Sequence, residues 1–148
     1  MSTLTEHETG SARGTRLERI RMASFGALTM LILQFVLGTA YTLYGTAPTA
    51  KKSVGLFSSP LLAIHVILGI LLVVAAAALV FRAVQAKSGA ALATSIVGLV
   101  AIIAAGFAGG SFAQDGADGA SLGMAIGTAV AMLCYAANLV FLPGKRRG

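Results

Sequence analysis

The chain has 148 residues, of which 57% are hydrophobic and 11% are charged, whereas an ordinary soluble domain has roughly 45–50% apolar and about 25% charged residues. This composition excludes a typical soluble globular domain. The net charge of +6 does not indicate nucleic-acid binding, because no soluble domain remains to present a basic face. Lys, Arg, Asp and Glu are absent from four runs, which cover residues 22–50, 53–81, 88–114 and 119–144.

Each of these runs exceeds the roughly 20 apolar residues that cross a hydrocarbon core as a helix. Transmembrane strands are only about 9–11 residues long and alternate between apolar and polar side chains, a pattern that the four runs lack. We therefore expect an all-α integral membrane protein, a four-helix bundle made of two transmembrane hairpins.

The first span is expected near 22–44, after a polar segment. Residues 1–18 mix Ser, Thr, Glu, Gly and Arg without an apolar period, which is typical of a flexible tail. The apolar stretch that follows is too long for the about 7–15-residue hydrophobic region of a signal peptide, and the Glu residues before it are foreign to such a peptide. We expect a retained helix that opens a membrane domain over 19–144.

Turn and cap residues divide the rest of the chain. Pro60 suits the first turn of a helix, the sequence QDGADG from Gln114 marks a turn, and Pro143 ends the last apolar run. A basic tail over 145–148 closes the chain. The three further spans are expected over about 60–81, 90–112 and 119–142.

The distribution of basic residues predicts the orientation. Nine of the eleven Lys and Arg lie before the first span, in the 82–87 connection or in the C-terminal tail, and the other two are Lys51 and Lys52. Because positive residues stay on the cytoplasmic side, both termini are expected to be cytoplasmic. No organelle-targeting segment is apparent, so we expect a multi-pass protein of the bacterial inner (plasma) membrane, with the lipid bilayer as its surroundings.

Small residues recur at intervals of four in the last two spans. Small faces let membrane helices approach closely. One interpretation is a seam for self-association, for docking on a larger membrane complex, or for a flat cofactor, and the other is ordinary packing between these two spans. The residues concerned are Ala101, Ala105 and Gly109 in the third span, and Gly119, Gly123, Gly127 and Ala131 in the fourth.

His65 is the only imidazole within the spans. An ionisable residue inside the membrane is a functional hypothesis by default, and Gly69, four residues on, lies beside it on the same helix face. A neutral His with a bare Gly next to it can present its nitrogen to a large planar ligand without a clash, so His65 is the candidate ligand residue. The alternative is a hydrogen bond from His65 to a neighbouring carbonyl or to interfacial water.

Gln34 is a second polar residue within an apolar run. It either lines a pocket or makes a hydrogen bond between helices, the commoner role of such residues in membranes. As an orienting partner for His65 it is a weak candidate, because counting residues from the helix ends places it nearer the midplane. Asn138, near the inner end of the fourth span, has the same two interpretations.

The stretch LQFVLGTAYTLYGTAP, followed by a loop and PLLAIHVILGILL, resembles a helix pair of the heme A synthase family. The resemblance covers about residues 31–72 and rests on Gln34, Leu37–Gly38, Pro60 and His65. It implies that His65 is an axial heme ligand. The family supplies a pair of histidines in each half, and this chain has a single membrane histidine. The resemblance therefore implies a heme b-binding or accessory relative rather than a synthase.

Two candidates for a second iron ligand follow. One is His65 of a second chain, and the other is Met124, which is expected at the same depth; His/Met ligation raises a heme's reduction potential. The alternative for Met124 is simple packing.

No motif of hydrolysis or phosphoryl transfer is present, so we expect no catalytic residues and leave enzymatic activity open. The two hypotheses are a heme b-binding redox protein and a non-catalytic accessory subunit, either a homo-oligomer or part of a larger complex.

Overall fold

The computed structural model describes residues 2–45, 48–49 and 53–142, and the basic tail expected over 145–148 lies outside them. Helices make up nearly all of the described chain, and no β-strand occurs in it. The all-α expectation is therefore confirmed. The four helices are α1 (Ser2–Tyr44), α2 (Pro60–Gln85), α3 (Gly89–Asp115) and α4 (Asp118–Phe141).

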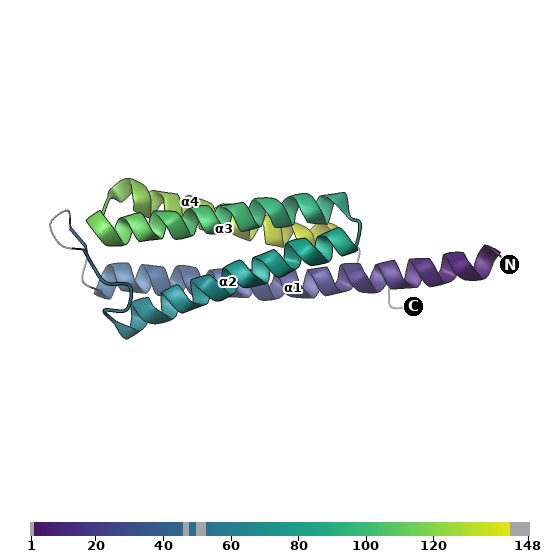
Figure 1. Ribbon diagram of the computed structural model, residues 1–148, viewed down its shortest axis with the longest axis horizontal. Coiled ribbons are helices and arrows are strands. Elements are labelled where there is room, and N and C mark those ends of the chain that lie inside the picture. Colours follow the sequence, from purple (N-terminus) through teal and green to yellow (C-terminus); the bar gives the residue numbers. More distant parts are fainter. Residues whose placement is uncertain (1, 46–47, 50–52, 143–148) are drawn as a thin grey trace.

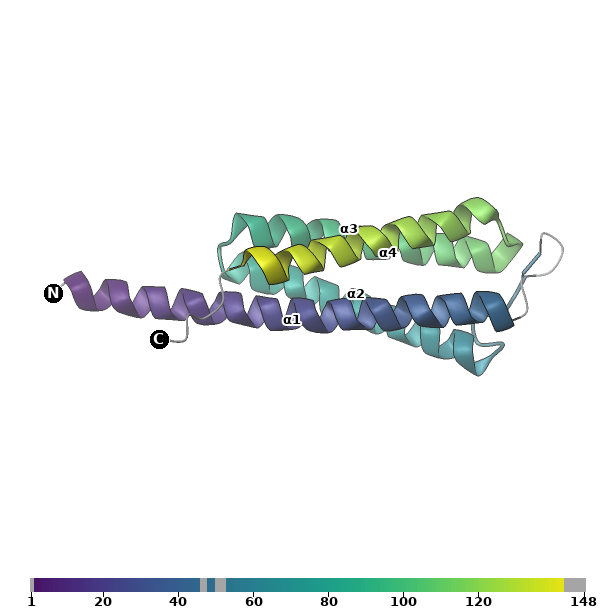
Figure 2. The same cartoon turned by 180° about the vertical axis from the view of Figure 1, so that it is seen from behind.

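The helices run up and down in a four-helix bundle (Figures 1 and 2). α1 packs on α2 and α3 packs on α4, which are the two expected hairpins, and contacts of α1 with α4 and of α2 with α3 close the ring. We call the end at which α4 finishes and α2 turns into α3 the terminal end. The opposite end, where α1 connects to α2 and α3 to α4, is the loop end. α1 projects beyond the bundle at the terminal end (Figure 1).

All four helices are long and apolar enough to cross a membrane. Their outward surfaces carry many exposed large apolar side chains, among them Phe25, Val74, Phe107 and Val140. Such a surface would be an aggregation hazard in water but suits contact with lipid. The chain is a multi-pass membrane protein by these criteria. The apolar helical segments are Gly14–Tyr44, Pro60–Gln85, Gly89–Asp115 and Gly119–Phe141.

α1 begins at Ser2, 20 residues before the expected start of the first span. Leu17, Ile20, Ser24 and Ala27 are all buried, and their spacing of three or four residues continues the buried face of the helix toward its beginning. This buried stripe extends the packed part of α1 past the arginines that were expected to mark its entrance. The chain is helical over 2–18, for which the composition predicts a flexible tail; the mobility of that segment stays a prediction.

Local signals set the other helix ends. The Ser59 hydroxyl accepts a hydrogen bond from the Leu62 amide at 3.2 Å, and Pro60 occupies the first turn, as helix N-termini prefer. Ser88 caps α3 in the same way through the Ala91 amide. α3 ends at Gly116, which has a φ of 71°, the left-handed conformation that favours glycine.

The hydrophobic core lies mainly in the terminal half of the bundle, and all four helices contribute to it. Polar contacts join three of the helices there: Asn138 on α4 donates to the Ser24 hydroxyl of α1 at 3.2 Å and accepts from the Thr94 hydroxyl of α3 at 2.6 Å. Asn138 therefore makes hydrogen bonds between helices. The buried cluster comprises Leu17, Ile20, Ala27, Leu31, Leu72, Ala76, Leu79, Ala83, Ala86, Ala91, Ala101, Ile102, Ala131, Tyr135 and Leu142.

The small-residue pattern of the last two spans forms a packing seam between α3 and α4. A Cβ placed on Gly127 would lie 2.8 Å from the Ala101 carbonyl oxygen and 3.0 Å from the Ala105 Cβ, and one on Gly123 would lie 3.3 Å from the Ala108 Cβ. A Cβ on Gly119 would meet no atom within 4 Å in the described part of the chain. Gly123 and Gly127 thus serve packing within the chain, whereas Gly119 does not take part.

Candidate functional site

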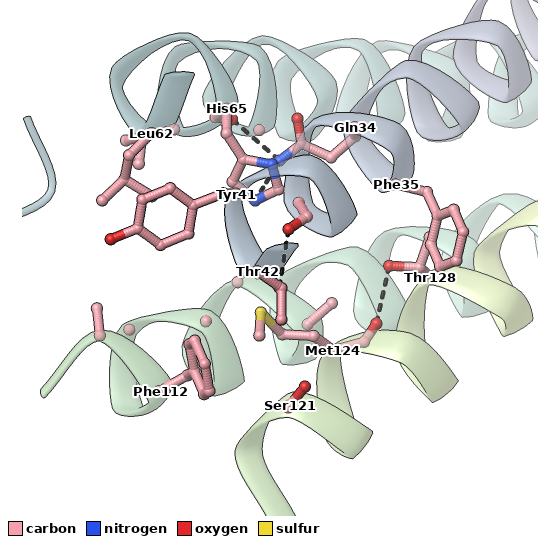
Figure 3. A pocket seen from close by; sticks show the side chains of 18 of the residues that line it. Gln34, Phe35, Tyr41, Thr42, Leu62, His65, Phe112, Ser121, Met124 and Thr128 are labelled. Atoms are coloured by element: carbon pink, nitrogen blue, oxygen red, sulfur yellow. Dashed lines mark hydrogen bonds between the residues drawn. The ribbon is translucent and has the colours of Figure 1, made fainter. Parts of the chain in front are cut away.

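Gln34 of α1 and His65 of α2 contact each other in the loop-end half of the bundle (Figure 3). The side-chain nitrogen Nε2 of Gln34 lies 3.1 Å from ring nitrogen Nε2 of His65 and donates to the His65 backbone oxygen at 3.0 Å. Gln34 is therefore a direct partner of His65. Gln34 does lie about one turn deeper than His65, at the level of Gly69, but its side chain reaches the ring, so the expectation that it is a weak partner is wrong.

Two glycines make this contact possible. A Cβ on Gly69 would lie 3.1 Å from the Gln34 amide nitrogen, and a Cβ on Gly38 would lie 3.1 Å from Cε1 of the His65 ring. Each polar side chain thus sits over the glycine that lies four residues beyond its partner. Gln34 with Gly38 and His65 with Gly69 form a reciprocal pair across the α1–α2 interface.

A cavity of about 570 Å³ borders this pair, within the roughly 300–1,000 Å³ typical of small-molecule sites. All four helices contribute to its walls. Each of the site residues expected from the sequence, Gln34, His65, Gly69 and Met124, lines it. The structure therefore brings together in one cavity residues that lie up to 90 positions apart in the chain.

Met124 reaches the cavity from α4, across from Gln34 and His65 (Figure 3). A Cβ on Gly109 of α3 would lie 3.1 Å from the Met124 sulfur, so this glycine leaves room for the thioether. The sulfur is a soft ligand atom on a flexible side chain. The cavity thus has an imidazole nitrogen on one wall and a thioether sulfur on another.

The remaining polar groups of the cavity walls are mostly engaged within their own helices. The hydroxyl groups of Thr39, Thr42 and Thr128 donate to the carbonyl oxygens four residues earlier, at 2.9, 2.9 and 2.8 Å. No charged side chain lines the cavity in the described part of the chain. The walls therefore suit a largely apolar ligand rather than a small ionic one.

The donor set distinguishes a bare metal ion from a metal macrocycle. No group of three or more His, Cys, Asp and Glu side chains that could hold a metal ion occurs among the described residues, and zinc sites in proteins use three or four such ligands. A heme iron needs only one or two axial ligands from the protein. His65 and Met124, which both line the cavity, carry donor atoms of the kind that heme iron takes from proteins.

Two parts of the site were not expected. Gly38 belongs to the resemblance and Gly109 to the small-residue pattern of the third span, but neither was expected to accommodate the His65 ring or the Met124 sulfur. A signal for Gly38 does exist, because Gln34–Gly38 and His65–Gly69 share the same spacing of four. Two helices that each carry a long polar residue and a glycine at that spacing can exchange them across an antiparallel interface.

The chain matches no protein-family model, and comparison with curated proteins and with solved structures finds no significant match.

Proposed function

We propose that the chain is a heme b-binding protein of the bacterial plasma membrane, with both termini in the cytoplasm. The fold supports the expectation that both termini lie on one side of the membrane. α1 enters the bundle and α4 finishes at the same end, the terminal end (Figure 2). The orientation rests on the nine of eleven Lys and Arg that belong to this side in the sequence. The cavity then lies in the outer half of the membrane.

One observation carries the heme proposal: the only imidazole of the membrane spans borders a cavity large enough for a small-molecule ligand. His65 is the proposed iron ligand; Gly38 accommodates its ring, and Gly69 accommodates the Gln34 amide that contacts the ring. Met124, which lines the same cavity, would be the candidate for a second iron ligand. Bound heme would supply an iron centre that takes up and releases one electron.

The test is an absorbance spectrum of the protein purified in detergent from heme-replete cells. We expect a Soret band that is lost in His65→Ala and kept in His7→Ala, a matched change at the only other histidine. Met124→Leu shifts the spectrum if the thioether is the sixth ligand. A wild-type protein without Soret absorbance rules out the heme proposal.

The second candidate function is a non-catalytic accessory subunit of a larger membrane complex or homo-oligomer. The observation that favours it is the contact of Gln34 with His65, which gives ring nitrogen Nε2 a partner within the chain. Under this proposal the pair only locks α1 against α2. Co-purification with a membrane complex, without bound pigment, is the expected result.

A further inference from the structure

The contact between Gln34 and His65 defines which way the Gln34 amide points. Oxygen and nitrogen of an amide are interchangeable by shape, so the surrounding hydrogen bonds must assign them. One end of the Gln34 amide lies 3.0 Å from the His65 backbone oxygen, which only accepts hydrogen bonds. That end is therefore the NH2 group, since an amide oxygen there would face another acceptor.

The amide in turn defines the tautomer of His65. The same NH2 group lies 3.1 Å from ring nitrogen Nε2, so Nε2 must be the acceptor and carries no proton. A neutral imidazole has one protonated nitrogen, and here it is Nδ1. In the described part of the chain no hydrogen bond reaches Nδ1. No partner of Nδ1 therefore favours the tautomer with the proton on Nε2.

Packing holds this arrangement in place. The Gln34 amide lies over Gly69 and the His65 ring lies over Gly38. A Cβ on either glycine would come within 3.1 Å of the side chain that lies over it. Both side chains are thus pressed between two helices as well as bonded to each other. The amide has little freedom to turn while the ring stays where it is.

We propose that Gln34 is the positioning residue of His65: it fixes the tautomer with the proton on Nδ1 and occupies the lone pair of Nε2, so that a ligand of His65 must displace the Gln34 amide. The identity of that ligand, heme b, rests on the function proposed above. Gln34 then has two opposed effects. It presents the nitrogen that iron requires in its unprotonated form, and it competes with the iron for that nitrogen.

The tautomer is tested in heme-free protein by ¹⁵N NMR of the histidine rings in detergent, with His65→Ala to assign the signals. We expect a protonated Nδ1 and an unprotonated Nε2 for His65. In Gln34→Leu the Nε2 resonance shifts, because it loses its hydrogen-bond donor. A proton on Nε2 in the wild-type protein overturns the proposal, and this measurement requires neither heme nor a variant of Gln34.

The competition is tested by titration with hemin. Losing an ordinary hydrogen bond corresponds to a factor of about 2–10, so Gln34→Leu should bind hemin about 2–10-fold more tightly than the wild-type protein. Gln114→Leu, the same change at an exposed position near the end of α3, should bind like the wild type. Equal or weaker binding by Gln34→Leu refutes the competition.

The two proposals fail in different ways. If neither the wild-type protein nor Gln34→Leu binds hemin, both the heme function and the competition for Nε2 are wrong, and the NMR result alone decides the tautomer. If only Gln34→Leu binds hemin, the result supports the occupation of the Nε2 lone pair by Gln34 and does not support heme binding by the wild-type protein.

Discussion

The three glycines at intervals of four in α4 are equivalent in the sequence, and the structure predicts that they are not equivalent in stability. Replacement of Gly127 by Ala puts a Cβ 2.8 Å from the Ala101 oxygen and 3.0 Å from the Ala105 Cβ. Replacement of Gly119 puts a Cβ in a place with no neighbour within 4 Å. The pair Gly127→Ala and Gly119→Ala therefore tests the packing of α3 on α4 directly.

The difference between the two variants has a definite size. Against the roughly 3.5 Å of an ordinary carbon contact, the new methyl of Gly127→Ala falls short by about 0.5–0.7 Å, and overpacking of this kind costs about 1–3 kcal/mol. The gain in helix preference from Gly to Ala, up to about 1 kcal/mol in a helix interior, is smaller at Gly119, which lies in the first turn of α4, so a fraction of it offsets the overpacking cost without reversing the order. We expect Gly127→Ala to be about 1–3 kcal/mol less stable than Gly119→Ala.

Thermal unfolding in detergent, followed by circular dichroism, measures this difference. With about 2–4 °C per kcal/mol for a chain of this size, the melting temperature of Gly127→Ala should lie about 2–12 °C below that of Gly119→Ala. Gly123→Ala should fall between them, because its nearest neighbour, the Ala108 Cβ, is 3.3 Å away. Equal melting temperatures for all three variants would show that α3 and α4 do not pack as described.

Two further predictions concern topology and the terminal half. Cysteines introduced at Ser53 and Ala117 should react with an impermeant reagent added outside intact cells and one at Ser11 should not, because the basic residues place the termini inside; labelling at Ser11 reverses the orientation. Asn138→Leu removes two hydrogen bonds between helices and should lower the free energy of unfolding by about 1 kcal/mol. Thr29→Val, whose hydroxyl bonds only to its own helix, should cost less, and an equal loss contradicts the role of Asn138.

The membrane fold was predictable from the sequence because the signals are long and physically simple. Each uncharged run is longer than a bilayer span, and inside a bilayer a helix satisfies the hydrogen bonds of its own backbone. Pro60 and the turn after Gln114 mark helix ends that the structure confirms within three residues. The start of α1 was not predictable in this way. The arginines before Met22 suggested a boundary, whereas Leu17 and Ile20 are buried on the same face as the span itself.

The candidate site was predictable in its members and not in its contacts. His65, Gly69, Gln34 and Met124 each stood out by residue type or spacing, and all of them line the cavity. Their partnership depends on the reach of the Gln34 side chain, which bridges the one turn between the levels of the two residues and which counting residues does not reveal. For the same reason Gln34, expected to be a weak candidate, is the hydrogen-bond partner of the His65 ring.

The uneven filling of the bundle has a consequence for permeability. Ile20, Leu79 and Tyr135, from three different helices, are almost wholly inaccessible in the terminal half, while the cavity lies in the other half. A water wire or an ion path between the two faces of the membrane would require these side chains to separate. The packed terminal half therefore separates the cavity from the terminal end of the bundle.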